Sequence, residues 1–480
     1  MINSFAWDFI GRITSQIVSV IVGIVLARIL TPAEFGLVGM SMVFIAMSGL
    51  FTNLGLASAL IQRTNPEEIH YSSSFFLNIG SAAILTSIFI LAAPLIAKFF
   101  NNASIISLIR VLSLSLLITS FSTVQEAMLR KDMRFKTLAK AKIIGAGLSG
   151  ATGISMALSG FGVWSLVTQT IIGRFVPTVY YWVVSSWKPK LQFHFKAIRE
   201  LWSYSLSLLI AGIIDTIYRQ LDTVIIARIF TTTDLGLFSK AKSLNQFAVK
   251  YSSQSIDVIT FPALSKIKNE RTRLIETGLK AEVFIAFITF CLLGWLFVSS
   301  ESLILTLLGQ KWEASVQIFR LLCLSGFVYP VSSASLNMLK ASGDSKSFLK
   351  VEVIKKIIGL IGLSIGFMFG LKGYLISLII TGMISVLLNM LFTSRSLNIS
   401  IGHQLLPILP YVLLGIISSL IVEIVHINFR LQYVNFILIT IAFFCVYFAL
   451  NYLIKTDGIR LFIVQMNKLK EIARNKFLMS

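Results

Sequence analysis

The stretch ARILTPAEFGL at residues 27–37 returns as ARIFTTTDLGL at residues 227–237. The offset is 200 residues, and the Ala, Arg, Ile, Thr, Gly and Leu positions are identical, with an acid at the same place in both copies. Shorter matches follow in the same order: Met-Leu and a basic residue at 128–130 and 338–340, and Lys-Ile-Ile-Gly at 142–145 and 356–359. The sequence therefore predicts that a unit of six helices occurs twice.

Both copies of this stretch are typical of one helix ending and another beginning. A hydroxyl at the N-cap and an acid three residues later form a capping box, and Thr31 with Glu34 and Thr231 with Asp234 have this spacing. We expect each stretch to be a short turn between two helices.

The composition is that of a membrane protein. Of 480 residues, 56% are hydrophobic and only 13% are charged, whereas about a quarter are charged in soluble domains. A helix that spans a bilayer needs ~20 apolar residues. Fourteen candidates lie at 9–29, 36–60, 75–97, 104–127, 143–159, 163–185, 203–227, 235–262, 282–299, 315–338, 356–370, 373–394, 405–426 and 433–454. We predict an all-α integral membrane protein with 14 transmembrane helices.

Lysine and arginine gather in every second loop, as they do in the cytoplasmic loops of membrane proteins. If the first loop is outside, the outside loops hold six basic residues and the inside segments hold 28. Both termini are then cytoplasmic. The net charge of +21 is explained by this orientation, so nucleic-acid binding is not expected. No basic residue precedes the first apolar stretch, so we expect no cleaved signal peptide.

The repeat also predicts the organisation of the chain. We expect an N-terminal lobe of helices 1 to 6 at 1–200, a C-terminal lobe of helices 7 to 12 at 201–400, and two appended helices with a basic tail at 401–480. Because six is even, both copies cross the membrane in the same direction, which implies a pseudo-two-fold axis along the membrane normal and a cleft between two lobes. This is the plan of an alternating-access transporter.

Polar residues form stripes on three predicted helices. Asp215, Arg219 and Asp222 are spaced i, i+4 and i+7, which places them on one face. The corresponding arc of the first helix carries Asp8, Arg12, Ser15 and Ser19, and the eighth helix carries Lys242, Gln246, Lys250 and Asp257. A charge inside a lone helix costs roughly 2.5–3.5 kcal/mol on insertion scales, so these residues should face protein or water. A net-positive cleft suits an anionic head group, although the Asp-Arg-Asp ladder alone could serve only helix packing.

The candidate substrate-binding residues are Arg12, Arg174, Arg219, Lys242, Gln246 and Lys250, and the acids that could support them or couple transport are Asp215, Asp222, Asp257 and Glu423. Arg174 stands beside Gly173 and Pro177, which suggests a broken helix, so it could support a kink or contact substrate. Glu423 could be a proton site or a contact between lobes.

Other motifs point away from catalysis, metals and cofactors. Cys291, Cys323 and Cys445 lie far apart without metal-ligand spacing. GAGLSG at 145–150 matches a dinucleotide motif, but it lies inside an apolar stretch and is better explained as small-residue helix packing, as are the glycines at 362, 366 and 370. No Walker A sequence occurs, and no loop is large enough for an active site outside the membrane. We expect a transporter, not an enzyme.

The quoted residues also resemble a known family. Trp7 and Arg12, the junction LARILTPAEFG at 26–36, and RVLSLSLLITSFSTVQEAMLRKDMRFK at 110–136 are similar to the Wzx-type polysaccharide flippases. These belong to the multidrug/oligosaccharidyl-lipid/polysaccharide exporter superfamily, and the likeness is to its colanic-acid and teichuronic-acid exporter branch. It covers nearly the whole chain.

The resemblance implies a bacterial cytoplasmic membrane protein that moves an undecaprenyl-diphosphate-linked oligosaccharide to the outer leaflet. It implies that Arg12 belongs to a cationic lumen, that helices 13 and 14 border a groove for the lipid tail, and that membrane lipids, a polysaccharide polymerase and chain-length machinery are partners. Two alternatives remain: a cation-coupled drug exporter of the same superfamily, and a membrane-embedded polysaccharide polymerase or ligase.

Overall fold

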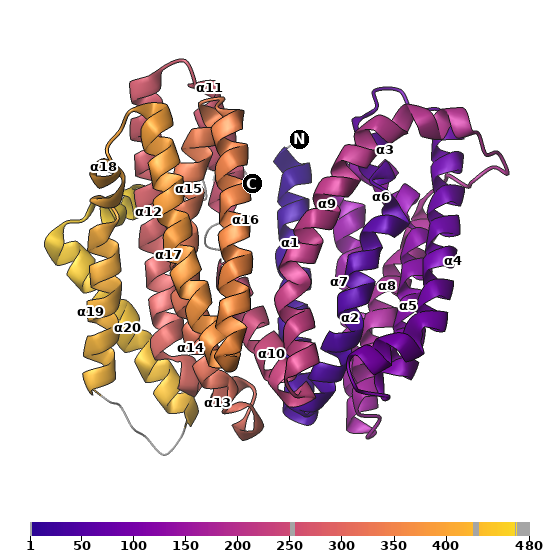
Figure 1. Ribbon diagram of the computed structural model, residues 1–480, viewed down its shortest axis with the longest axis horizontal. Helices are drawn as coiled ribbons and strands as arrows, with labels where there is room; N and C mark the ends of the chain where they lie inside the picture. Colours follow the sequence, from indigo (N-terminus) through magenta and orange to yellow (C-terminus); the bar gives the residue numbers. More distant parts are fainter. Residues whose placement is uncertain (1, 250–254, 426–431, 466, 468–480) are drawn as a thin grey trace, which may run out of the picture. The chain divides into compact units, whose positions relative to one another are not determined.

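A computed structural model describes residues 2–249, 255–425, 432–465 and 467 of the chain, and within these ranges every regular element is a helix. The chain packs as two compact units, unit 1 (residues 1–239) and unit 2 (residues 240–480) (Figure 1). The lobe boundaries at 200/201 and 400/401 stay a prediction.

Unit 1 is built from nine helices and the start of a tenth. They are α1 (Ile2–Ile29), α2 (Pro32–Asn53), α3 (Leu56–Gln62), α4 (Glu68–Phe99), α5 (Ile105–Ser120), α6 (Thr123–Lys131), α7 (Phe135–Leu158), α8 (Val163–Val184), α9 (Phe195–Ile229) and the first residues of α10 (Thr232–Val249).

The remaining elements belong to unit 2. They are the rest of α10, α11 (Ser255–Lys266), α12 (Arg271–Val298), α13 (Ser300–Leu307), the 3-10 turn η2 (Gln310–Trp312), α14 (Ser315–Gly326), α15 (Val328–Ala341), α16 (Ser345–Met368), α17 (Gly370–Leu397), α18 (Ile401–Leu405), α19 (Leu409–Val425) and α20 (Gln432–Ile454).

The order of elements repeats along the chain. The series α1 to α8, with α2/α3 and α5/α6 as consecutive pairs, matches α9 to α17, where α10/α11 and α14/α15 are the pairs and α13 with η2 is inserted. Twelve of the fourteen predicted apolar stretches overlap one helix or one such pair; 356–370 covers part of α16 and the first residue of α17, and 405–426 covers the last residue of α18 and all of α19. Among the described residues seven helices, or eight if the bent pair α5/α6 counts as one span, are long and apolar enough to cross a membrane. The chain is a multi-pass membrane protein; the number fourteen stays a prediction.

The predicted capping box forms in full at α10, where the Thr231 hydroxyl accepts from the Asp234 backbone N–H at 3.1 Å, and by half at α2, through the bonds to the Glu34 carboxylate. The carboxylate of Glu34 accepts hydrogen bonds from the backbone N–H of Thr31 at 2.7 Å and from its hydroxyl at 2.9 Å. The carboxylate of Asp234 does the same for Thr231, at 3.2 and 2.7 Å. These side chains satisfy donors that the start of a helix leaves free, so α2 and α10 begin where the sequence predicts.

Small residues bring the helices of unit 1 together. A Cβ added at Gly145 of α7 would lie 2.8 Å from the ring of Pro177 in α8, and one added at Gly150 would lie 2.3 Å from Val22 of α1. In unit 2, Gly362 and Gly366 of α16 face α17 equally closely. The predicted small-residue packing is confirmed at these four glycines, whereas Gly147 and Gly370 have no atom within 4 Å of an added Cβ, and Gly370 instead begins α17 with a positive φ of 77°.

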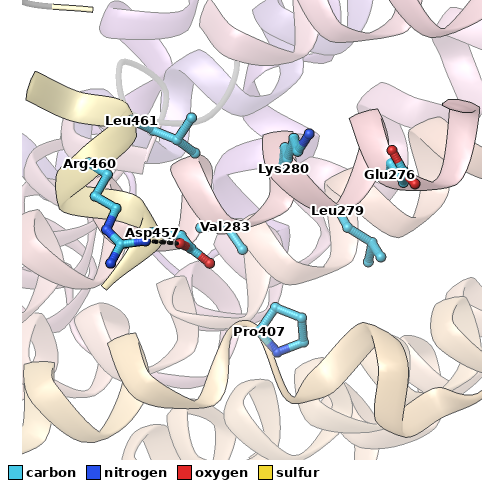
Figure 2. A pocket seen from close by; sticks show the side chains of 8 residues that line it. All are labelled: Glu276, Leu279, Lys280, Val283, Pro407, Asp457, Arg460 and Leu461. Atoms are coloured by element: carbon cyan, nitrogen blue, oxygen red, sulfur yellow. Dashed lines mark ion pairs between the residues drawn. The ribbon is translucent and has the colours of Figure 1, made fainter. Parts of the chain in front are cut away.

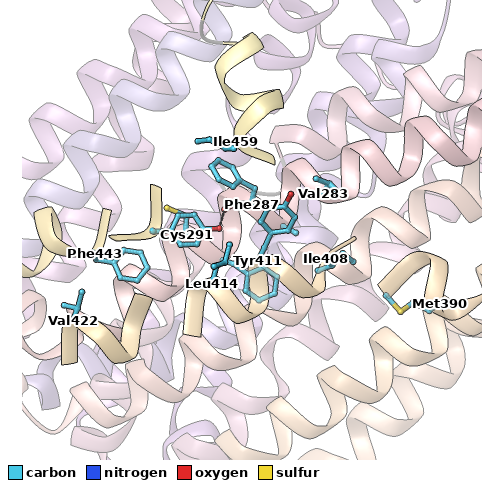
Figure 3. Packing of buried hydrophobic residues seen from close by; sticks show 13 residues of the cluster. Val283, Phe287, Cys291, Met390, Ile408, Tyr411, Leu414, Val422, Phe443 and Ile459 are labelled. Atoms are coloured by element: carbon cyan, nitrogen blue, oxygen red, sulfur yellow. Dashed lines mark hydrogen bonds between the residues drawn. The ribbon is translucent and has the colours of Figure 1, made fainter. Parts of the chain in front are cut away.

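The core of unit 2 joins α12 to the two helices appended after the repeat. Phe287 of α12 packs against Tyr411 of α19 and Tyr447 of α20, and the Tyr447 hydroxyl donates a hydrogen bond to the Phe287 carbonyl at 2.9 Å (Figure 3). Ile459, in the segment after α20, covers the same cluster. The appended helices are therefore an integral part of unit 2.

Candidate functional site

The two copies of the duplicated stretch meet inside unit 1. A Cβ built on Gly36 of α2 would lie 1.8 Å from the carbonyl oxygen of Thr232, and one built on Gly236 of α10 would lie 1.8 Å from that of Pro32. The first turns of α2 and α10 therefore touch backbone to backbone, and the contact is reciprocal, as expected for equivalent parts of a duplicated sequence. Only glycine allows this approach.

The polar stripe of α9 forms partly as predicted. Arg219 donates from Nε to Oδ2 of Asp215 at 2.7 Å, and the two side chains are 71% and 50% exposed. Asp222, one turn later, is buried, and its Oδ1 accepts hydrogen bonds from the backbone N–H and the hydroxyl of Thr223. The structure thus brings Asp215 and Arg219 together and orients Asp222 through its neighbour.

Arg12 is exposed on α1, next to the face that packs on α7. Gly11 meets Ala139 of α7 closely, which fixes the rotation of α1. The hydroxyl of Ser15 donates to the Arg12 carbonyl at 3.1 Å, and that of Ser19 donates to the Ser15 carbonyl at 2.8 Å. The serines of this stripe therefore use their donors within α1.

The predicted stripe of α10 lies beside a buried face of the same helix. Asn245 is buried and its side-chain nitrogen lies 3.7 Å from Sγ of Cys323 in α14. Lys242 is half-buried and Gln246 is exposed, one helical turn apart. Lys250 lies outside the described residues, as does the side chain of Asp257.

Arg174 and Glu423 are exposed on α8 and α19, in units 1 and 2 respectively. The expectation of a broken helix at Arg174 is wrong, because α8 continues from Val163 to Val184 with Pro177 inside it. The proline ring is accommodated by Gly145 of α7, which has no side chain to collide with it. The Arg174 carbonyl accepts a hydrogen bond from the Thr178 hydroxyl at 2.9 Å.

A pocket of about 400 Å³ lies at the start of α12 in unit 2 (Figure 2). Its lining residues are Glu276, Leu279, Lys280, Val283, Pro407, Asp457, Arg460 and Leu461. Arg460 and Asp457 form an ion pair at 3.6 Å, so the charges on this wall neutralise each other. The pocket contains none of the candidate residues.

A cluster at the start of α9 fixes the connection between the two repeats. Glu200 accepts from Nη2 of Arg63 at 2.6 Å and from Nε2 of His70 at 3.1 Å. Nδ1 of His70 accepts from the backbone N–H of Glu67, so the proton of the neutral ring is on Nε2. The bonds from His70 and Arg63 hold the pKa of Glu200 below its ordinary value of 4.5.

One buried acid was not among the candidates. Glu282 of α12 is 1% exposed, and the sequence places it at the very start of a predicted span, where a charge reaches water. Its burial has a structural cause: α12 begins at Arg271, so Glu282 lies about three turns into the helix. The turns before it carry Arg271, Arg273, Glu276 and Lys280 among their apolar residues, and these charges are why hydropathy places the helix start too late.

Comparison with known proteins identifies the family. The sequence matches the family described as "Polysaccharide biosynthesis protein" over residues 25–317, which is more than half of the chain. The chain belongs to this family. The resemblance to polysaccharide flippases is therefore confirmed at the level of the family.

This polysaccharide biosynthesis protein has curated relatives of similar length. It is 24% identical over 340 residues to the teichuronic acid biosynthesis protein TuaB of Bacillus subtilis (strain 168), which covers 70% of each chain. It is 25% identical over 320 residues to the succinoglycan biosynthesis transport protein ExoT of Rhizobium meliloti (strain 1021), which covers 66% of this chain and 65% of that one.

The fold is shared with a solved flippase structure. The lipid II flippase MurJ in an inward closed conformation matches with a TM-score of 0.73 at 16% identity, over 96% of this chain and 100% of that chain. The predicted all-α membrane transporter fold is confirmed.

Proposed function

We propose that the chain flips undecaprenyl-diphosphate-linked oligosaccharides from the inner to the outer leaflet of a bacterial cytoplasmic membrane. Three findings support this: its family, the transport function in the name of its relative ExoT, and the fold it shares with the lipid II flippase MurJ. Both termini are cytoplasmic in this proposal, as the distribution of basic residues favours.

The hydrogen bonding of the Arg219 side chain is the main structural support for the proposal. Its guanidinium is bound by Asp215 along one edge, through Nε, while both Nη groups have no partner among the described residues. An arginine oriented in this way presents two parallel N–H donors, the geometry that binds a phosphate in bidentate fashion. The carboxylate aligns the guanidinium, and the diphosphate of the lipid-linked sugar is the ligand that the free edge suits.

The other candidates complete a cationic site in this proposal. Arg12, Arg174, Lys242, Lys250 and Gln246 would contact the diphosphate and the first sugar. Asp222, Asp257 and Glu423 would hold the bases in place or couple transport. The two repeats rock against each other, so that the head group crosses while the polyprenyl chain stays in lipid. The flipped unit then passes to a polysaccharide polymerase and its chain-length machinery.

The test is Arg219→Ala in a strain from which the gene has been deleted. We expect loss of surface polysaccharide and accumulation of lipid-linked repeat units on the cytoplasmic side, with normal amounts of protein in the membrane. Arg219→Lys keeps the charge but loses the bidentate edge, so export should be reduced and not abolished. Surface polysaccharide at the wild-type level in Arg219→Ala would refute the role of this residue.

Arg273→Ala is the matched control. Arg273 is 66% exposed and is paired with Glu270 at 3.1 Å on the same helical turn, so it has the same chemistry away from the proposed site. Export should be unchanged in this variant. If a strain without the gene instead carries repeat units in the outer leaflet but does not polymerise them, the flippase proposal fails and the polymerase alternative gains.

A further inference from the structure

Unit 2 contains a carboxyl group that the proposed site does not use. Glu282 lies on α12 and is almost completely buried. Its Oε1 accepts a hydrogen bond from the hydroxyl of Ser335 in α15 at 3.2 Å, and its Oε2 has no partner. Within the part of the chain that the structure describes, no cation lies within ion-pair distance of this group.

The surroundings of Glu282 are closed, and apolar clusters lie near it. One turn earlier, a Cβ added at Gly278 would lie 2.3 Å from Sδ of Met338, so α12 and α15 are in tight contact beside the acid. Met338 belongs to one apolar cluster, and Val283, the neighbour of Glu282, belongs to another. Burial without a counter-ion disfavours the ionised carboxylate, so this packing favours the protonated form of Glu282.

On the helices that pack on α12, the titratable groups whose side chains the structure describes are engaged elsewhere or exposed. Tyr411 of α19 accepts a hydrogen bond from the Gly458 backbone N–H, Tyr447 of α20 donates one to a backbone carbonyl, and Cys323 of α14 is bonded by Asn245. Arg320 of α14 forms an ion pair with Glu301 of α13. The exposed groups are Lys266 of α11, Lys340 of α15, Glu423 of α19 and Cys445 of α20, and the side chain of Asp257 in α11 lies outside the described residues. On α12 itself, Glu276, Lys280 and the residues 270–273 are exposed, and Cys291 is buried.

The first repeat shows what this position needs for packing alone. Ala59-Leu60 and Asn65 recur as Ala263-Leu264 and Asn269, an offset of 204 that aligns Asn78 of α4 with Glu282. Gln125 of α6 aligns with Ser335 at the offset of 210 already seen in the neighbouring Met-Leu pair. Asn78 and Gln125 are both fully buried. A neutral amide therefore fits the position, and the second repeat has a group that can ionise.

We propose that Glu282 is a proton-binding site: it holds a proton while α12 and α15 are packed together, and releases it when their separation admits water to Oε2. The proton-binding site stands on the geometry of unit 2 alone, whereas its coupling to transport rests on the proposed function. Protonation adds one proton to the carboxylate and release returns it to solvent, so no other reactant is involved.

Infrared spectroscopy of the full chain in liposomes tests proton binding without any transport assay. At neutral pH the wild-type protein should show the carbonyl stretch of a protonated carboxyl that shifts in D2O, and Glu282→Gln should lose that band. Glu276→Gln, which removes an exposed acid of the same helix, should keep it. An unchanged band in Glu282→Gln would overturn the proposal. Thermal unfolding shows whether the variants are folded, and Glu282→Asp, which restores an acid, should regain the band.

A second measurement addresses coupling. Export of surface polysaccharide in a strain without the chromosomal gene is followed with and without a protonophore, for the wild type, Glu282→Gln and Glu276→Gln. We expect the protonophore to reduce export by the wild type and Glu276→Gln, and Glu282→Gln to export less and to lose this sensitivity. Wild-type export that ignores the protonophore, or Glu282→Gln that keeps the full response, overturns the coupling. If no form of the protein exports polysaccharide, the proposed function fails while the infrared result still decides the proton site.

Discussion

Replacing the glycines where α2 meets α10 should destabilise unit 1. In Gly36→Ala the new Cβ would lie 1.8 Å from the Thr232 carbonyl oxygen and 2.7 Å from its carbon. Protein Cβ atoms do not approach other atoms closer than 3.0 Å, so the backbone of α10 must retreat by at least 1.2 Å. A backbone atom cannot rotate away as the end of a flexible side chain can.

The size of the effect follows from two opposing contributions. Alanine favours a helix over glycine by up to about 1 kcal/mol. Overpacking of a close contact typically costs about 1–3 kcal/mol and occasionally more, and here the obstacle is backbone. We expect a net loss for Gly36→Ala and a similar loss for Gly236→Ala, because the contact is reciprocal. One separation relieves both clashes, so the double variant should lose less than the sum of the two single variants.

The assay is thermal unfolding of the purified protein in detergent, compared at one scan rate because membrane proteins often unfold irreversibly. Gly39→Ala is the matched control: it lies one turn along α2, and its Cβ would meet Leu235 at an ordinary 3.6 Å. Its Tm should equal or exceed that of the wild type. If Gly36→Ala and Gly236→Ala unfold at the same temperature as Gly39→Ala, the backbone contact is not formed in solution and the reasoning is refuted.

Two further predictions concern the helix starts. The hydrogen bonds from His70 and Arg63 hold the pKa of Glu200 below 4.5. They therefore stabilise the fold above pH 4.5, and this contribution is lost as the pH falls through the lowered pKa. The Tm of the wild type should fall over this acidic range, and the Tm of Glu200→Gln should fall less. Thr231→Ala should cost about 0.5–2 kcal/mol through loss of the bond from the Asp234 backbone N–H, whereas Thr231→Ser should retain most of the Tm; equal loss in both would contradict the capping role.

Local sequence chemistry was enough to predict much of the fold. The capping residues and the turns between α1 and α2 and between α9 and α10 depend on residues close together in the chain, where spacing determines geometry. The unbroken α8 was not predictable in this way. Whether Pro177 breaks a helix depends on the space that α7 leaves for its ring, and that is a contact between helices.

The features of the candidate site also differ in whether local sequence could predict them. The pair Asp215 and Arg219 follows from the i, i+4 spacing, which places the two side chains within reach of each other on any helix. Glu282 could not be found from the sequence, because its burial depends on where α12 begins and on how closely α15 packs beside it. Hydropathy detects the apolar part of a helix and not its polar first turns.

Comparing equivalent positions of the two repeats shows which side chains the fold requires and which it does not. Ser15 and Ser19 on α1 are hydrogen-bonded within their own helix, and the offset of 200 aligns them with Asp215 and Arg219 on α9. The same helix can thus be built with neutral side chains at both positions.

The same comparison aligns the neutral Asn78 of α4 with the ionisable Glu282 of α12. Both positions are buried, so the two residues differ in their ability to ionise and not in exposure. Ionisable groups cost free energy in an apolar interior, and a repeat that folds without them shows that folding does not demand them. At each of these aligned pairs the first repeat has the neutral residue and the second the ionisable one. At these positions the second repeat adds ionisable groups that folding does not require, and in the proposed function they act together with Arg12 and Arg174 of the first repeat.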